Sequence, residues 1–348
     1  MRWARWTVFF LLVGLMCFFL VGCGNDPQAG VEPQEPVIEE PPPPPPPPMD
    51  ISPFSGQLEL LERLERRPVA VMIDNDPVTR PQAGLAQADL VFEALVEGGT
   101  TRFMAVYLQA EPELVGPVRS ARHYFAQIAL GLDAIYAHVG GSPQAHQFIT
   151  EHKMGDFNDV LGTGFGCFWV DKNKKRPYST FTSVPMLREK AEQRGFRAGG
   201  VPDQLFSFRS GDQALAGDPV TNLTIHYPGY LQTRVGYRYT PSGDYLRYVG
   251  GQPHRDAATG EQLRADNILV LYVETWAIPG DQQDRIDMDL VGSGALDCFS
   301  GGHLYTGTWS KASVSAPLKF QGQQGRLELT AGKTWIQIVP VGTKIESE

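Results

Sequence analysis

The chain has 348 residues, of which 42% are hydrophobic, and its formal net charge is -9. It is long enough for one or two domains with a sizeable core. Residues 51–348 carry 28 basic and 33 acidic side chains, a balance that excludes the basic footprint of a nucleic-acid-binding protein and a polybasic membrane patch.

The first 22 residues have the features of a bacterial lipoprotein signal peptide. Arg2 and Arg5 precede an apolar stretch, residues 8–21, which has no charged residue and ends in the sequence LVGC at Cys23. This ending resembles a lipobox, in which small residues admit the signal peptidase and the cysteine thiol accepts a lipid. A short transmembrane anchor is the alternative for an apolar stretch of this length. We expect Cys23 to begin the mature chain and to anchor it on the extracytoplasmic face of the cell membrane.

Residues 23–56 are expected to form a disordered, proline-rich and acidic tether. Residues 24–50 contain six acidic and no basic side chains, and residues 41–48 are eight consecutive prolines. Such a composition does not bury a core. The proline run predicts polyproline II helix, roughly 25 Å long at about 3.1 Å per residue.

Residues 57–210 are expected to form an N-terminal α/β layered domain. Apolar runs rich in valine and isoleucine predict strands, and apolar residues at helical spacing predict helices. The expected strands are residues 68–75, 88–97, 101–108 and 134–141. The expected helices are residues 57–67, 120–134, 142–152 and 183–195, with Ser120 as a cap of the second. Alternation of strands and helices is typical of an α/β or α+β fold.

Residues 218–345 are expected to form a smaller, mainly antiparallel β domain. Short alternating segments are separated by glycine-rich turns, and no helical pattern interrupts them. The expected strand regions are residues 222–227, 234–251, 267–276, 303–311 and 325–340.

Several polar loops follow the expected strands of the N-terminal domain, where α/β sheets commonly bind ligands. Arg119 and Arg122 are three residues apart and would share one face of the expected helix, either as donors for a phosphate or carboxylate group or as a solvated, salt-bridged face. The sequence VGGSP resembles an anion-binding nest, although it is also an ordinary tight turn. The candidate ligand-binding residues are Arg102, Arg119, Arg122, Gly140, Gly141 and Ser142.

Three carboxylates are candidates for acid–base chemistry: Asp74, Glu93 and Glu97. If Glu93 and Glu97 share one strand, they lie about 13 Å apart, which exceeds the separation used by glycosidases. The catalytic alternative that stays open is Asp74 or Asp76 paired with one of the glutamates. A serine hydrolase based on Ser142 is not favoured, because the G-x-S-x-G elbow is missing.

Two further groups of residues in the body have more than one interpretation. Trp309, Lys311 and Trp335 are either a stacking platform for sugar rings or part of a β-domain core. Cys167 and Cys298 are either a disulfide or two buried thiols. Neither cysteine has metal-ligand spacing to a histidine or another cysteine, so we expect no metal site and no cofactor.

Motifs in both halves of the body resemble those of one known protein family. The N-terminal motifs that carry the resemblance are RPVAVMIDN, RPQAGLAQADLVFEALVEGGTTRFMAVY, GPVRSARHYF and IYAHVGGSPQA. The C-terminal motifs are NILVLYV, GTWSK and AGKTWIQIVP. With these motifs the chain resembles the YerB-like lipoprotein family. The similarity spans roughly residues 58–340 and implies a two-domain lipoprotein on the outer face of Gram-positive-type cells. It implies no reaction, and it does not explain the eight-proline run.

These observations favour a membrane-anchored binding or accessory protein of the cell envelope. Its arginines would hold an anionic group of a wall polymer, and its lipid would be its contact with the membrane. Two alternatives are a hydrolase of glycosidic or phosphodiester bonds and a scaffold for another envelope protein. We expect no nucleic-acid partner.

Overall fold

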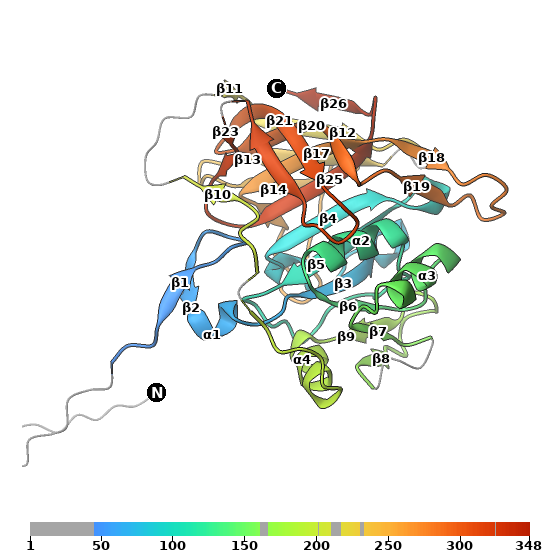
Figure 1. Cartoon of the computed structure of the whole chain (residues 1–348). Helices are drawn as coiled ribbons and strands as arrows, with labels where there is room; N and C mark the ends of the chain where they lie inside the picture. Colours follow the sequence, from blue (N-terminus) through green and yellow to red (C-terminus); the bar gives the residue numbers. More distant parts are fainter. Residues whose placement is uncertain (1–44, 161–165, 201, 210–216, 230–232, 324) are drawn as a thin grey trace, which may run out of the picture. The chain divides into compact units, whose positions relative to one another are not determined.

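A twelve-stranded sheet runs through the described part of the chain, and both halves of the sequence contribute strands to it (Figure 1). The structure is a computed structural model that describes residues 45–160, 166–200, 202–209, 217–229, 233–323 and 325–348. The expected signal peptide, the Cys23 lipidation site and most of the tether lie outside these residues. The structure is mostly β.

The large sheet has a mixed strand order. From edge to edge the strands are β23 (Gly325–Arg326), β22 (Lys319–Gly322), β21 (His303–Lys311), β20 (Gly292–Ser300), β17 (Asn267–Val273), β25 (Thr334–Pro340), β4 (Leu90–Leu95), β5 (Thr101–Tyr107), β3 (Val69–Asp74), β6 (Ile135–His138) and β7 (Asp156–Asn158), and β11 (Asp218–Pro219) pairs with β21. Strand β25 lies between β17 and β4 and is parallel to both. One C-terminal strand therefore joins the two halves of the sequence into one sheet.

A six-stranded antiparallel sheet packs on one face of the large sheet. Its strands are β15 (Gln252–Pro253), β14 (Tyr245–Val249), β13 (Arg234–Tyr239), β12 (Asn222–His226) and β26 (Lys344–Ser347) in that order, and β16 (Arg264–Ala265) pairs with β14. Alternate residues of β12, β13 and β14 point into the core, and those between them face solvent. This alternation is typical of an antiparallel sheet with one wet face.

The remaining elements are short pairs of strands and a few helices. The pairs are β1 (Met49–Ile51) with β2 (Leu58–Leu60), β8 (Phe168–Val170) with β9 (Thr180–Thr182), β18 (Thr275–Ala277) with β19 (Ile286–Met288), and β10 (Ser207–Phe208) with β24 (Glu328–Leu329). The helices are α1 (Leu61–Leu64), α2 (His123–Gly131), α3 (Pro143–Glu151) and α4 (Val184–Gln193), with 3-10 turns η1 (Pro77–Thr79), η2 (Leu85–Gln87) and η3 (Glu97–Gly99).

Strands β3, β4 and β5 are buried on both faces, which explains their nearly continuous apolar sequences. Helices α2 and α3 cover the face that includes Met72 and Met104. Helix α4 and the six-stranded sheet cover the opposite face, which includes Ile73 and Phe103. Adjacent residues of a strand point to opposite faces of the sheet, so each polar residue in these strands faces one of the two cores.

The folded body begins earlier than the expected tether allows. Met49–Ile51 pair with Leu58–Leu60 as a hairpin, and Phe54 between them is fully buried. The helix expected over residues 57–67 is correspondingly reduced to Leu61–Leu64. Strand pairing overrides the helix propensity of the first residues of this segment.

The two cysteines of the body do not form a disulfide. Cys167 and Cys298 are both free and buried. Burial raises the pKa of the Cys298 thiol to about 12, so it is not a reactive thiolate at neutral pH. Within the described residues, no helix has the length and apolar character needed to cross a membrane.

The two sheets meet at a buried charge network centred on Glu93 of β4 and Arg247 of β14. Both side chains are fully buried, and Arg247 Nη2 donates to Glu93 Oε2 at 2.7 Å. The second carboxylate oxygen of Glu93 accepts from Thr101 Oγ1 at 2.7 Å and from Asn75 Nδ2 at 3.2 Å. The guanidinium of Arg247 also stacks on the Trp335 ring at 4.5 Å. Because every polar group of the pair has partners, its charges are tolerated in the core.

A neutral histidine extends this network. Arg247 Nε donates to His254 Nδ1 at 3.1 Å, so the proton of the His254 ring is on Nε2, which lies 2.8 Å from Gln82 Oε1. Burial, with the charges of Arg247 and Arg80, holds the pKa of His254 well below its usual range. Protonation of Nδ1 would place a positive charge against the guanidinium.

Glu93→Gln is expected to lower the free energy of unfolding by about 3–5 kcal/mol, because it leaves the Arg247 charge buried without a carboxylate. The matched control is Arg264→Met, which removes the mostly exposed partner of Asp244. It is expected to lower the free energy of unfolding by about 0–1 kcal/mol. Urea unfolding of both variants measures the difference. Equal costs for the two variants would contradict a dominant role for the buried pair.

Histidine 254 is expected to make stability fall on mild acidification. Its folded-state pKa lies below the unfolded value of about 6.5, so the unfolded chain takes up the proton first as the pH falls. Its stabilisation is complete above about pH 6.5 and is lost below that pH at up to about 1.4 kcal/mol per pH unit. Unfolding curves of wild type and His254→Gln between pH 5 and 7 measure this slope, which the variant should lack.

Candidate functional site

The three candidate arginines lie close together at one end of strands β3 and β5. We name Arg102, Arg119 and Arg122, with the carboxylates of Asp74 and Glu97, the arginine cluster. Asp74, the last residue of β3, lies directly across from Arg102 of β5. Three guanidinium groups against two carboxylates leave one formal positive charge in the cluster.

Each arginine of the cluster contacts a carboxylate. Arg119 Nε lies 2.8 Å from Asp74 Oδ2, and Arg122 Nε donates to Glu97 Oε2 at 2.8 Å. Arg102 Nη2 lies 3.9 Å from Glu97 Oε1, and Arg102 Nη1 donates to the Ser120 carbonyl at 2.8 Å. Salt bridges, the alternative to a ligand clamp, therefore exist for all three.

Exposure distinguishes the three arginines. The side chains of Arg102 and Arg122 are 5% and 7% exposed, whereas that of Arg119 is 27% exposed. Burial, together with the charge of Arg122, lowers the pKa of Arg102 to about 10. The Arg119 guanidinium lies 5.5 Å from the Tyr178 ring centroid. Arg119 is thus the arginine of the cluster that a ligand in solvent can reach.

The expected helical face of Arg119 and Arg122 is wrong. Helix α2 begins at His123, Arg122 is its N-cap residue, and no side chain caps it, so Ser120 does not. Residues 119–122 instead run beside the loop that follows β6: the N–H of Val139 donates to the Arg119 carbonyl, and the N–H of Ala121 to the Gly140 carbonyl. Because these backbone hydrogen bonds hold residues 119–122 in an extended conformation, the helix does not begin before His123.

The Gly140-Gly141-Ser142 loop lies beside the arginine segment, but it is not an open anion nest. The Gly140 N–H donates to Asn158 Oδ1 at 2.9 Å, and the Ser142 N–H to the Ala121 carbonyl at 3.2 Å. Ser142 Oγ accepts from the Ala145 N–H and caps α3, as its sequence position predicts. These groups position the loop, and two of its three amide donors already have acceptors.

The three candidate carboxylates do not form a catalytic pair. Glu93 lies across from Phe103, and Asp74 lies across from Arg102; adjacent residues of one strand point to opposite faces, so the two carboxylates are on opposite sides of the sheet. Glu97 is not in the same strand as Glu93, because β4 ends at Leu95.

The surroundings of these carboxylates also do not suit acid catalysis. Glu93 is fully buried and bound to Arg247, and Asp74 is bound to Arg119. Although burial opposes it, the hydrogen bond from Arg122 lowers the pKa of Glu97, whereas a general acid needs a raised pKa. Each of these carboxylates already balances an arginine.

Of the two interpretations of Trp309, Lys311 and Trp335, the structure agrees with the β-domain core and not with a stacking platform. These side chains are 2%, 1% and 0% exposed, respectively. Lys311 Nζ donates to the Val314 carbonyl at 2.8 Å, and burial lowers its pKa to about 8. The tryptophans therefore fill the core. In the described residues, no cluster of three or more histidine, cysteine, aspartate or glutamate side chains is arranged to hold a metal ion.

Sequence reasoning missed the partners of Glu93. Arg247 lies between Tyr245 and Val249 in an alternating strand and shares their side of the sheet. A charged residue at an inward position of such a strand indicates a buried ion pair. The pattern gives no indication of which carboxylate is the partner.

Comparisons with known proteins match both halves of the chain. Residues 54–197 match the model described as "Protein of unknown function (DUF3048) N-terminal domain", and residues 223–336 match the corresponding C-terminal domain. The chain is 34% identical over 293 residues to the "Putative lipoprotein YerB" of Bacillus subtilis (strain 168), covering 83% of this chain and 86% of that protein.

A solved structure agrees with this relationship. The crystal structure of the YerB protein from Bacillus subtilis matches with a TM-score of 0.75 and 32% identity, over 85% of this chain and 99% of that one. Sequence and structure thus match over most of both proteins. The chain belongs to the two-domain YerB-like family of DUF3048 proteins.

Proposed function

We propose that this protein is a lipoprotein anchored through Cys23 on the extracytoplasmic face of the cell membrane, and that its folded body binds an anionic group of a cell-wall polymer. The Bacillus subtilis relative is named "Putative lipoprotein YerB", which supports the lipoprotein assignment. The LVGC sequence and the proline-rich segment after it support an anchor followed by a spacer. The spacer would hold the body away from the membrane, within reach of the wall.

The observation that carries the binding proposal is the exposed guanidinium of Arg119. An arginine has five N–H donors, and Arg119 Nε lies 2.8 Å from Asp74 Oδ2 as an ion pair without a hydrogen bond. The donors of the two Nη atoms suit a carboxylate or phosphate group. Buried Arg102 and Arg122 add positive charge behind Arg119, and Tyr178 covers one side of it. An anionic ligand would compete with Asp74 for the charge of this guanidinium.

The two alternative functions have less support. The hydrolase requires a free carboxylate, and Asp74, Glu93 and Glu97 are all bound to arginines. The scaffold is supported by exposed tryptophans in two different strand pairs, Trp276 of β18 and Trp169 of β8, which are 46% and 36% exposed. Exposed aromatic side chains on separate strand pairs do not define a protein partner.

Cys23→Ala is expected to abolish incorporation of radiolabelled palmitate in cells, because the thiol that accepts the lipid is missing. Cys17→Ala is the matched control, since Cys17 lies inside the signal peptide and should leave labelling unchanged. Labelling of the Cys23→Ala protein at the wild-type level would refute the anchor.

Arg119→Gln is expected to weaken retention on purified wall polymer about tenfold, because it removes a charged donor from the binding group. Asp74→Asn is expected to strengthen retention, since it removes the competing carboxylate. Arg63→Gln, at a surface arginine paired with Glu59, serves as the control. Pull-down with purified peptidoglycan and teichoic acid measures all three. Equal retention of Arg119→Gln and Arg63→Gln would eliminate Arg119 as a ligand.

A further inference from the structure

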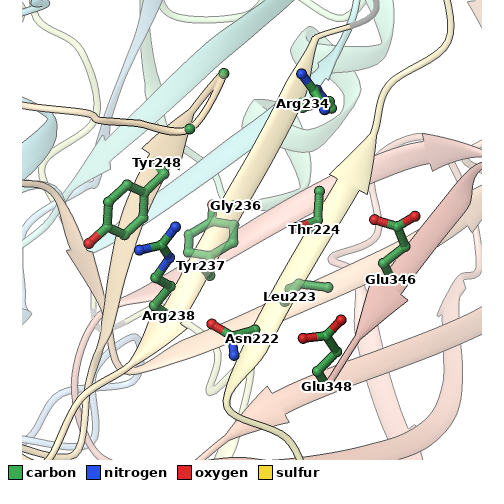
Figure 2. Close-up of a pocket in the computed structure, with 12 residues that line it drawn as sticks. Asn222, Leu223, Thr224, Arg234, Gly236, Tyr237, Arg238, Tyr248, Glu346 and Glu348 are labelled. Carbon is green, nitrogen blue, oxygen red and sulfur yellow. The ribbon is translucent and has the colours of Figure 1, made fainter.

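A groove of about 450 Å³ lies on the exposed face of the six-stranded sheet, away from both polar clusters described above (Figure 2). It crosses strands β13, β12 and β26. Its side chains are mainly polar or charged: Asn222, Thr224, Arg234, Arg238, Tyr248, Glu346 and Glu348. Figure 2 shows Tyr248 and Arg238 on one side of Gly236, with Glu346 and Glu348 on the other.

The floor of the groove is Gly236, in the middle of strand β13. It lies between Tyr248 of β14 and Thr224 of β12 in the strand register. A Cβ atom at this position would meet Tyr248 Cβ at 3.6 Å and the Leu223 carbonyl at 3.8 Å, which are ordinary contacts. A larger residue would therefore fit, and it would suit a strand better than glycine. A glycine that packing does not require is typical of a place where a ligand approaches the backbone.

Two arginines flank this glycine. Arg234 and Arg238 lie on the same face of β13, about 13 Å apart by strand rise. No carboxylate within ion-pair distance of either is recorded in the described residues, in contrast to the arginine cluster. Arg238 instead stacks over the Tyr248 ring at 4.3 Å. The β13 side of the groove thus offers hydrogen-bond donors together with an aromatic wall.

The opposite side of the groove offers acceptors. Glu346 lies in strand β26 and Glu348 directly follows it, two strands and therefore about 10 Å away from β13. Hydrogen bonds from Lys344 and His226 lower the pKa of Glu346 to about 2, so it stays ionised. A polyanion would meet this acidic row, and a polycation would meet the two arginines. A ligand for the whole groove must satisfy donors and acceptors together.

We infer that this groove binds a polysaccharide chain of hydroxyl-bearing sugars. A hydroxyl group both donates and accepts, so it complements the guanidinium groups on one side and the carboxylates on the other. The Tyr248 ring, on which Arg238 stacks, holds that guanidinium beside the floor of the groove. The bare backbone at Gly236 leaves room for a ring to lie on the sheet. This site is separate from the arginine cluster and goes beyond its proposed ligand.

Gly236→Val tests the groove directly. The valine side chain fills the floor and should weaken binding at least tenfold, while the melting temperature stays equal to or above that of wild type, because valine is favoured in strands. The probe is the soluble, peptide-free glycan strand released from peptidoglycan, chosen because the proposed function places the protein at the wall. Binding is measured by isothermal titration calorimetry. Thr308→Val, at an exposed position of β21, is the control.

Arg238→Gln provides a second variant that does not depend on filling the groove. It should weaken glycan binding about tenfold, the effect of losing a charged hydrogen bond. Arg255→Gln, at an arginine outside the groove lining, should bind like wild type. Wild-type affinity in either Gly236→Val or Arg238→Gln would overturn the inference. So would failure of the wild type to bind the glycan, or preferential binding of a peptide of alternating lysine and glutamate.

The two proposals fail separately when wall-polymer retention is measured on teichoic acid alone, because peptidoglycan also carries the glycan strand proposed for the groove. If Arg119→Gln loses retention on the wall polymer but still binds the glycan, the result supports two independent sites. If Gly236→Val loses glycan binding while Arg119→Gln retains wall polymer fully, the groove stands and the arginine site falls. If only Arg119→Gln has an effect, the groove proposal falls.

Discussion

The buried contact between Glu93 and Arg247 is the constraint that organises this protein. A charge in the core is tolerated only where its partner and its remaining hydrogen bonds are supplied together. Here the carboxylate comes from the N-terminal half, the guanidinium comes from the C-terminal half, and the surrounding tyrosine, threonine and amide groups come from both. We expect this pair to favour one register of the two sheets, because a shift would leave two ions unpaired. Its expected contribution is specificity, beside the stability that the apolar core supplies.

The two faces of the large sheet differ in how exposed their polar residues are. The polar residues on the Glu93 face are fully buried and serve packing. The polar residues on the Asp74 face lie near the surface, where the Arg119 side chain is partly exposed to solvent. The groove on the wet face of the six-stranded sheet offers a second and chemically different surface. The two proposed sites, one for charge and one for hydroxyl groups, would together suit a polymer that presents both.

Local patterns predicted much of the fold but not the way its halves meet. The valine- and isoleucine-rich segments correspond to β3, β4 and β5, and Ser142 caps α3, because both signals arise within a few residues of sequence. The position of β25 beside β4 depends on contacts between distant segments, which periodicity does not report. The same limit applies to the site. Spacing placed Arg119 and Arg122 near each other, but the backbone bonds to residues 139–142, not helical geometry, bring them together.

The central position of β25 also determines when the fold can be completed. Strand β4 is made long before β25, its partner on that side. Until β25 is made, the N-terminal half has an apolar strand with an unpaired edge, which is a template for association with other chains. A folding route for this protein must therefore keep the first half of the chain shielded until β25 is available.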